Sequence, residues 1–177
     1  LPSALYEVTD LMDRAPTWMA VQAKATILYE KAFWRERGLS GRVVSHIGPM
    51  FEVHDHCNAQ SGQAALFGFI AWPPEQRAQR PDELRREIRQ QLIRCFGEEG
   101  GAFSKLIVQD WAQEQFICSD RDLRTQPSHP DILPAALREP QLNDSIHFAV
   151  SETADISPGL IEGAIQSGKR AAASILK

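Results

Sequence analysis

Short apolar runs broken by polar residues occupy the middle of the chain, and this pattern predicts a sheet. Residues 42–57 and 64–72 are two such runs, joined by the turn-forming connector NAQSGQ. Apolar runs on either side of a glycine-containing turn are typical of antiparallel strands. The segment KLIVQDW (105–111) has the same character and predicts a further strand. The mostly apolar stretch 18–29 is expected to be a buried strand with Lys24 at its centre.

Three other segments have the spacing of helices. Residues 4–14 carry apolar side chains on one helical face. Residues 82–96 are the clearest helix, because an apolar residue recurs every four positions and Gly97 follows as a natural stop. The last helix is expected to begin at Ser157, a good N-cap, with Pro158 in its first turn.

The remaining segments predict loops and one more strand. Residues 33–41 are charged and contain two glycines, and residues 119–145 are rich in Pro, Asp and Arg without periodicity, so both are expected to be loops. Residues 146–150 (IHFAV) predict a short strand before the C-terminal helix. Because strands and helices do not alternate regularly, we expect an α+β fold: a mixed, mostly antiparallel sheet with flanking helices, plus a terminal strand–helix.

Composition narrows the functional classes. The 177 residues carry a net charge of −4, and the basic residues are scattered, which argues against a nucleic-acid partner. No apolar run approaches the ~20 residues needed to span a bilayer, and no signal peptide is recognisable, so a cytoplasmic protein without a membrane partner is expected. The three cysteines predict neither a disulfide framework nor a zinc site. His54 and His56 alternate on one strand face, but we expect a solvated face there and no metal site.

The C-terminal segment suggests a ligand site. A strand that runs into a loop and then a capped helix directs backbone N–H groups and the positive end of the helix dipole at one point. That point suits a phosphate or the electron-rich edge of a reduced flavin. The alternative is a plain C-terminal helix docked on a sheet.

Three blocks of sequence resemble the monoamine oxidase family. Residues 146–172 (IHFAVSETADISPGLIEGAIQSGKRAA) resemble the family's C-terminal flavin-binding motif. Residues 23–41 (AKATILYEKAFWRERGLSG) are similar to its stretch with a lysine on a strand, followed by Phe-Trp-Arg. Residues 109–116 (QDWAQEQF) are similar to its Asp-Trp segment beside the flavin. The blocks follow the family's order and spacing, so the resemblance covers nearly the whole chain.

The resemblance implies roles for individual residues. Lys24 matches the catalytic lysine that holds a water near flavin N5; the alternative is a charge that reaches the surface. Trp111 matches the tryptophan beside the isoalloxazine, and the alternative is an ordinary core aromatic. The other residues implied in cofactor binding are Ser151, Glu152, Thr153 and Ile161, and those implied in substrate binding are Leu160 and Phe116.

Three departures from the family pattern qualify these roles. The family has a glycine where Val150 stands, so the chain is expected to approach the cofactor less closely. Leu160 replaces an aromatic that forms part of a cage around the amine, which puts a typical small amine in doubt. Members with covalent flavin have a cysteine at the position of Asp120, so non-covalent FAD is expected.

The resemblance also implies a domain division and partners. Residues 1–145 match the substrate-binding domain, and residues 146–177 match the C-terminal segment of the FAD-binding domain. No G-x-G-x-x-G motif is present. The nucleotide-binding half is therefore expected on a partner chain, or the chain is a fragment, and we expect the isolated chain to be inactive.

The complete enzyme would oxidise the C–N bond of a small amine or amino acid and pass electrons to oxygen. A homo-oligomer is compatible with the resemblance. The alternative function is a non-catalytic binding or structural module that retains the amine oxidase fold.

Overall fold

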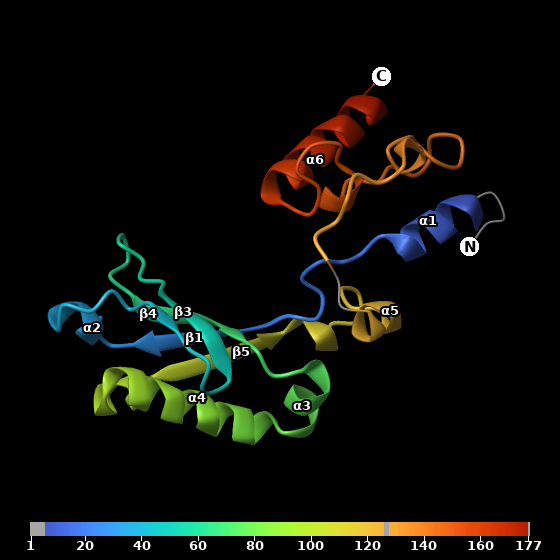
Figure 1. Ribbon diagram of the computed structural model, residues 1–177. Helices are drawn as coiled ribbons and strands as arrows, with labels where there is room; N and C mark the ends of the chain where they lie inside the picture. The colour runs from blue at the N-terminus through green and yellow to red at the C-terminus, as the bar shows by residue number, and fades with distance from the viewer. Residues whose placement is uncertain (1–5, 126–127, 177) are drawn as a thin grey trace. The chain divides into compact units, whose positions relative to one another are not determined.

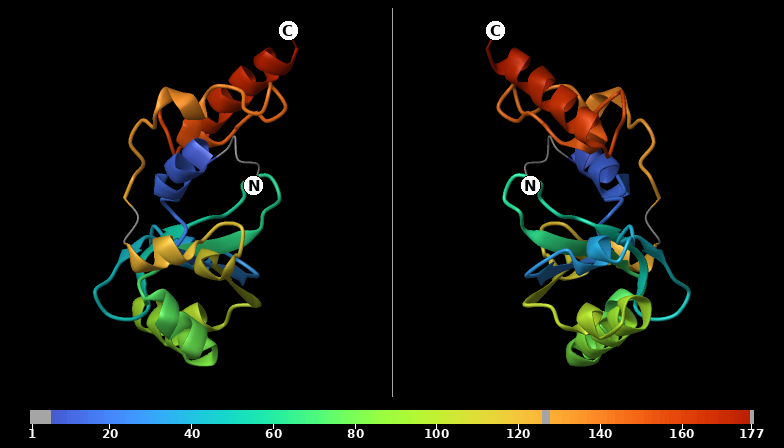
Figure 2. Two further views of the ribbon diagram at one scale, coloured as in Figure 1. Left: turned by 90° about the vertical axis from the view of Figure 1, so that its right-hand side faces the viewer. Right: turned by 90° about the vertical axis from the view of Figure 1, so that its left-hand side faces the viewer.

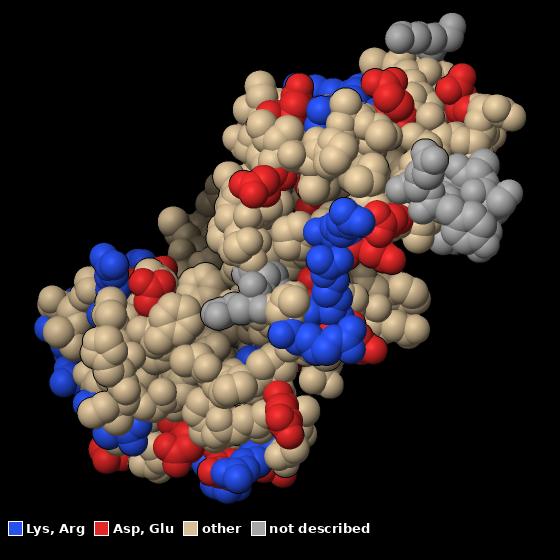
Figure 3. Space-filling model, turned by 45° about the vertical axis from the view of Figure 1, so that its right-hand side comes forward, with Lys and Arg blue, Asp and Glu red and all other residues tan. Residues whose placement is uncertain are grey.

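The computed structural model describes residues 6–125 and 128–176, which form two compact units. One unit is Val21–Phe116; the other combines Leu1–Ala20 with Ile117–Lys177. Figure 1 shows the elements of both units. On the face drawn in Figure 3, Lys and Arg side chains lie among Asp and Glu side chains.

The unit Val21–Phe116 is built on a five-stranded sheet in the order β2-β3-β4-β1-β5. Every neighbouring pair is antiparallel, which confirms the α+β class and the antiparallel sheet. The strands are β1 (Ala23–Tyr29), β2 (Val43–Val44), β3 (Met50–Asp55), β4 (Ala64–Ile70) and β5 (Lys105–Asp110). The helices and 3₁₀ turns of this unit are α2 (Phe33–Glu36), α3 (Pro74–Gln79), α4 (Pro81–Phe96), η2 (Glu98–Gly101) and η3 (Trp111–Gln113).

Alternation along the central strand β1 gives the sheet two different faces. Ala23, Ala25, Ile27 and Tyr29 are buried, and the residues between them are half-buried. Successive side chains of a strand point to opposite faces, so the buried set lies on one face. Helix α4 covers that face, as Figure 2 shows from two sides. Lys24 therefore lies on the other face.

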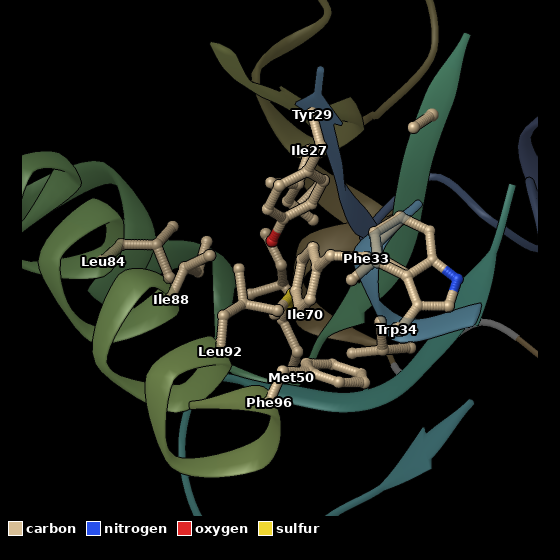
Figure 4. Packing of buried hydrophobic residues seen from close by; sticks show 14 of the residues in the cluster. Ile27, Tyr29, Phe33, Trp34, Met50, Ile70, Leu84, Ile88, Leu92 and Phe96 are labelled. Atoms are coloured by element: carbon tan, nitrogen blue, oxygen red, sulfur yellow. The ribbon is translucent and has the colours of Figure 1, made fainter. Parts of the chain in front are cut away.

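Helix α4 closes the hydrophobic core of this unit. Its apolar residues recur every four positions and are almost completely buried: Leu84, Ile88, Leu92 and Phe96. Figure 4 shows these side chains pointing towards residues of the sheet and of α2, which include Ile27, Tyr29, Phe33, Met50 and Ile70. Burial of each large apolar side chain stabilises the fold by about 1.5–3 kcal/mol.

Gln91 joins the same helix to the sheet through polar atoms. Its side chain is 1% exposed, its Oε1 accepts from Met50 N at 2.9 Å, and its Nε2 donates to Met50 O at 2.6 Å. A buried amide with both polar atoms bonded avoids the cost of an unsatisfied group and fixes the position of α4 along β3.

Asp55 at the end of β3 collects four hydrogen bonds. Trp34 Nε1 donates at 2.8 Å, Cys57 N at 2.9 Å, and Arg35 donates twice, at 2.6 and 2.8 Å. Burial alone would raise the pKa of Asp55, but the bonds from Arg35, Trp34 and Cys57 outweigh it and hold that pKa well below its usual range.

Asp55→Asn is expected to lower the stability of the 177-residue chain at neutral pH, with a smaller effect in acid. Because the folded-state pKa is depressed, the contribution of ionised Asp55 is fully present above the unfolded pKa of about 3.9. It is lost as the pH falls from there through the folded pKa. Urea unfolding at neutral and acidic pH measures this, with Asp131→Asn at an exposed position as control. A difference that does not depend on pH would contradict the assignment.

The second unit contains little regular structure. Its elements are α1 (Tyr6–Arg14), α5 (Asp120–Arg124), η4 (Ala135–Leu137), η5 (Ser151–Thr153) and α6 (Ile161–Ile175). Val8 of α1 and Leu137 of η4 are buried together at the centre of a small apolar cluster. Ser119 and Asp122 form a reciprocal capping box at the start of α5.

The structure confirms α4 and β5 within one residue but corrects other expected elements. Residues 18–22 lie outside the strand that begins at Ala23, and residues 33–41 begin with the short helix α2. The long segment 119–145 contains α5 and η4. The expected helix 4–14 is present from Tyr6 onward, and positions 4 and 5 lie outside the described residues.

The expected C-terminal strand and helix start are wrong. Residues 146–150 make only an isolated bridge, between Ile146 and Gln141, and the described part of their own unit contains no strand that could pair with them. Helix α6 begins at Ile161, with Leu160 rather than Ser157 as N-cap. Ser157 has a φ of 51° and its carbonyl accepts from Leu160 N, so it forms the turn that precedes the helix.

Candidate functional site

The residues singled out in the sequence fall into two groups, one in each unit. Lys24, Trp111 and Phe116 belong to Val21–Phe116, and the others belong to the second unit. Among the described residues, no group of three or more His, Cys, Asp and Glu side chains could hold a metal ion. No described helix is long and apolar enough to cross a membrane.

Lys24 lies on the sheet face opposite α4, above two aromatic rings. Its Nζ is 5.4 Å from the ring centroid of Phe69 and 5.9 Å from that of Phe67, both on β4. The side chain is half-buried, and no hydrogen bond or ion pair to its ammonium occurs within the described parts of the chain. A cation above aromatic faces is stabilised by roughly 0.5–1 kcal/mol or more while its protons remain free. Lys24 can therefore donate to a ligand or water.

Phe67 and Phe69 were not identified as site residues from the sequence. The antiparallel register pairs Lys24 with Phe69 and Thr26 with Phe67, so all four side chains share one face. Phe51 of β3 extends the aromatic surface, with its ring centroid 5.8 Å from that of Phe69. The alternation along β4 indicates that Phe67 and Phe69 share one face of a strand. The sequence does not show that this strand pairs with Lys24.

Trp111 follows β5 directly and continues its pairing with β1. Its backbone N–H donates to Gln22 O at 3.0 Å, two residues before Lys24. The indole is half-buried. Asp110 fixes the turn η3, because its side chain accepts from Ala112 N at 3.1 Å. The backbone register thus brings Trp111 close to Lys24.

Phe116 is almost fully exposed, unlike the half-buried Lys24 and Trp111. It is the last residue of this unit, and its side chain is 95% exposed. A large apolar side chain with that exposure is available for contact with a substrate or a partner.

Ser151, Glu152 and Thr153 form the turn η5. Ser151 Oγ donates to Glu152 Oε2 at 2.8 Å, and both residues are half-buried. Thr153 is only 4% exposed, and its hydroxyl donates to Val150 O at 2.9 Å. The Thr153 side chain therefore serves the turn itself, which leaves the turn's backbone and Glu152 as the groups available to a ligand.

A polar network ties η5 to α6 and was also missed in the sequence. Ser167 is fully buried and shares a 2.8 Å hydrogen bond with the hydroxyl of Thr153. Arg170 donates to Thr153 O at 3.0 Å, to Phe148 O at 2.8 Å and to both hydroxyls. Ser167 and Arg170 lie one turn apart on α6, and together they hold the loop in place.

The start of α6 is apolar and exposed. Leu160 is 43% exposed, Ile161 81% and Ile165 47%. The first N–H groups of a helix have no intrahelical partner, so those at Ile161 are oriented to bind an electron-rich group. A Cβ added at Gly163 would lie 2.3 Å from Ser157 O, so only glycine allows the preceding loop to approach this closely.

A family model described as flavin containing amine oxidoreductase matches residues 4–176. The chain is 34% identical over 158 residues to a putative flavin-containing monoamine oxidase of Mycobacterium tuberculosis, covering 86% of this chain and 33% of that protein. It is 28% identical over 172 residues to a probable flavin-containing monoamine oxidase A of Dictyostelium discoideum, covering 94% and 36%. The chain thus spans about a third of the length of the curated relatives it matches.

Two solved structures of amine oxidases also match this chain. Cyclohexylamine oxidase from Brevibacterium oxydans matches with a TM-score of 0.70 and 26% identity, over 99% of this chain and 38% of that one. Wild-type putrescine oxidase bound to putrescine matches with a TM-score of 0.64 and 25% identity, over 88% and 35%.

Proposed function

The chain belongs to the flavin containing amine oxidoreductase family, and from this premise we propose that it is the C-terminal part of an FAD-dependent amine oxidase. The complete enzyme would oxidise the C–N bond of an amine or amino acid and transfer electrons to oxygen. In this proposal, residues 1–145 provide the substrate side, and residues 146–177 the last segment of the FAD-binding domain.

The observation that carries the proposal is the environment of Lys24. A half-buried ammonium above two aromatic rings, with no hydrogen-bond or ion-pair partner in the described chain, fits a group that serves a ligand. The backbone N–H groups in the first turn of α6 and the turn η5 also suit a ligand, namely the electron-rich edge of a flavin. The residues present therefore suit the cofactor of the family.

FAD, when bound, accepts a hydride from the substrate and later delivers electrons to oxygen. The chain's own residues position and solvate the reactants. Lys24 would hold a water through its free protons at the reacting edge. Trp111 would pack against the flavin ring, and the aromatic surface of Phe67 and Phe69 would exclude bulk water around Lys24. In the other unit, Ser151, Glu152, Thr153 and Ile161 would contact the cofactor through their backbone groups and the Glu152 side chain.

The proposal also covers the class of substrate and the way in which the flavin is held. Leu160 gives no cation–π attraction to a small amine, so its apolar side chain favours a substrate with a larger apolar group. Phe116 is a second proposed contact of the substrate. Asp120 has no thiol with which to attach flavin, which supports non-covalent FAD. The exposed Leu160, Ile161 and Ile165 fit burial by the N-terminal FAD-binding half.

The direct test supplies the full-length protein with amines and amino acids and measures hydrogen peroxide. Turnover of at least one class, together with flavin that is released on acid precipitation, supports an oxidase with non-covalent FAD. Flavin that stays with the precipitate contradicts non-covalent binding.

A non-catalytic module is the second candidate, because Val150 and Leu160 both depart from the family pattern. If full-length protein binds flavin but gives no peroxide with any amine or amino acid, this candidate replaces the oxidase.

A further inference from the structure

Arg77 of α3 is a buried cation that bonds to residues at or next to the ends of three strands, β1, β4 and β5. Its side chain is 3% exposed. Nε and Nη2 donate to the two oxygens of Asp110 at 2.8 and 2.7 Å, Nη2 also donates to Val21 O at 2.9 Å, and Nη1 donates to Trp72 O. Every bonded partner is a carboxylate or carbonyl oxygen, and four of the five N–H groups of the guanidinium are bonded within the protein.

These partners stand directly beside the two predicted cofactor-facing residues of this unit. Asp110 precedes Trp111 in the chain and pairs with Ala23, which precedes Lys24. Val21 precedes Gln22, whose carbonyl accepts from Trp111 N at 3.0 Å. Asp110 Oδ1 also accepts from Ala112 N, which fixes the turn that carries Trp111. One guanidinium therefore holds both the start of β1 and the end of β5.

Stability alone does not account for such a pair. A buried ion pair loses so much hydration that an apolar substitute of the same volume is often equally stable. A bidentate Arg–carboxylate pair instead fixes distance and angle between its two segments. A lysine is a point charge without this fork and cannot reproduce the geometry.

We propose that Arg77 and Asp110 are positioning residues of the flavin site: their ion pair sets the positions of Trp111 and Lys24 relative to each other. This inference rests on the proposed function. It assigns to α3 a role in the reaction, although none of the residues proposed to touch flavin or substrate lies on α3.

The test is Arg77→Lys in the full-length, flavin-loaded protein, with Arg35→Lys as the control for loss of a bidentate Arg–carboxylate contact elsewhere in the unit. Arg35 makes the same bidentate contact with Asp55, but at the opposite end of β3 and β4 from Phe69, the strand partner of Lys24. We expect Arg77→Lys to lower kcat about tenfold or more with little change in KM, since small displacements of catalytic groups cost up to ~100-fold. The flavin absorbance band should also shift. Arg35→Lys should lower the melting temperature but leave kcat and the band unchanged.

Asp110→Asn provides a second variant if Arg77→Lys does not fold. It keeps the shape of the side chain but removes the charge and turns one acceptor oxygen into a donor, so the bidentate contact with Arg77 is lost. Hydrogen exchange at the amides of Trp111 and Ala112 gives a readout independent of turnover, and both should exchange faster in either variant. The inference is overturned if both positioning variants match Arg35→Lys in kcat, flavin band and exchange. A wild-type protein that binds no flavin overturns the proposed function instead, which the same spectra reveal before any variant is made.

Discussion

Replacing Lys24 by methionine in the full-length protein is expected to slow amine oxidation by about a hundredfold. Methionine keeps most of the length and apolar character of the lysine stem, so its packing on Phe67 and Phe69 is retained. It removes the ammonium whose protons are free in the structure. Loss of a positioned proton-bearing group typically costs 10²–10⁴-fold. Stopped-flow absorbance, followed separately for flavin reduction and reoxidation, measures which half-reaction depends on Lys24.

Lys105→Met is the matched control for this experiment. Lys105 lies on the neighbouring strand β5, pairs with Leu28 and is exposed. The Lys105→Met variant removes the same charge at a position that lies over neither Phe67 nor Phe69. Unchanged rates in Lys24→Met, with flavin bound, would remove Lys24 from the mechanism. Equal losses in both variants would point to net charge rather than to position.

Ile88→Ala is expected to destabilise the 177-residue chain by about 3 kcal/mol. Ile88 is 0% exposed at the centre of α4, where it packs against the sheet (Figure 4). Truncation of a buried isoleucine removes transfer free energy and leaves a cavity, and such changes cost roughly 2–5 kcal/mol. The free energy of unfolding from urea titration measures the effect, and the midpoint should fall without a change in slope.

Arg86→Ala, on the exposed side of the same helix, controls for helix propensity and should change stability by less than about 0.5 kcal/mol. A loss below about 1 kcal/mol for Ile88→Ala would contradict the packing of α4 on the sheet.

Local periodicity predicted the regular part of this fold well. The four-residue spacing of Leu84, Ile88 and Leu92 is visible in the sequence, and it gave α4 almost to the residue. No element was predicted for Pro74–Gln79, which forms helix α3, although proline is well accommodated at the start of a helix. At residues 146–150 an apolar run was taken for a strand, but a strand also needs a neighbour, and periodicity does not supply one.

The candidate site was predictable only in part, because its chemistry depends on long-range pairing. Resemblance singled out Lys24 and Trp111 as candidates, but the contact of Lys24 with Phe69 follows from strand register, which a single sequence does not specify. The ion pair of Arg77 with Asp110 joins residues 33 positions apart. The network of Thr153 with Ser167 and Arg170 likewise appears only when the loop is folded against α6.

The most direct test of the central claim is the visible absorbance spectrum of the full-length protein, recorded without oxygen before and after addition of amines and amino acids. We predict a flavin band that is bleached by a substrate and returns when oxygen is admitted. A protein that carries no flavin, or a flavin band that no amine or amino acid bleaches, would contradict the assignment of this chain to a working amine oxidase.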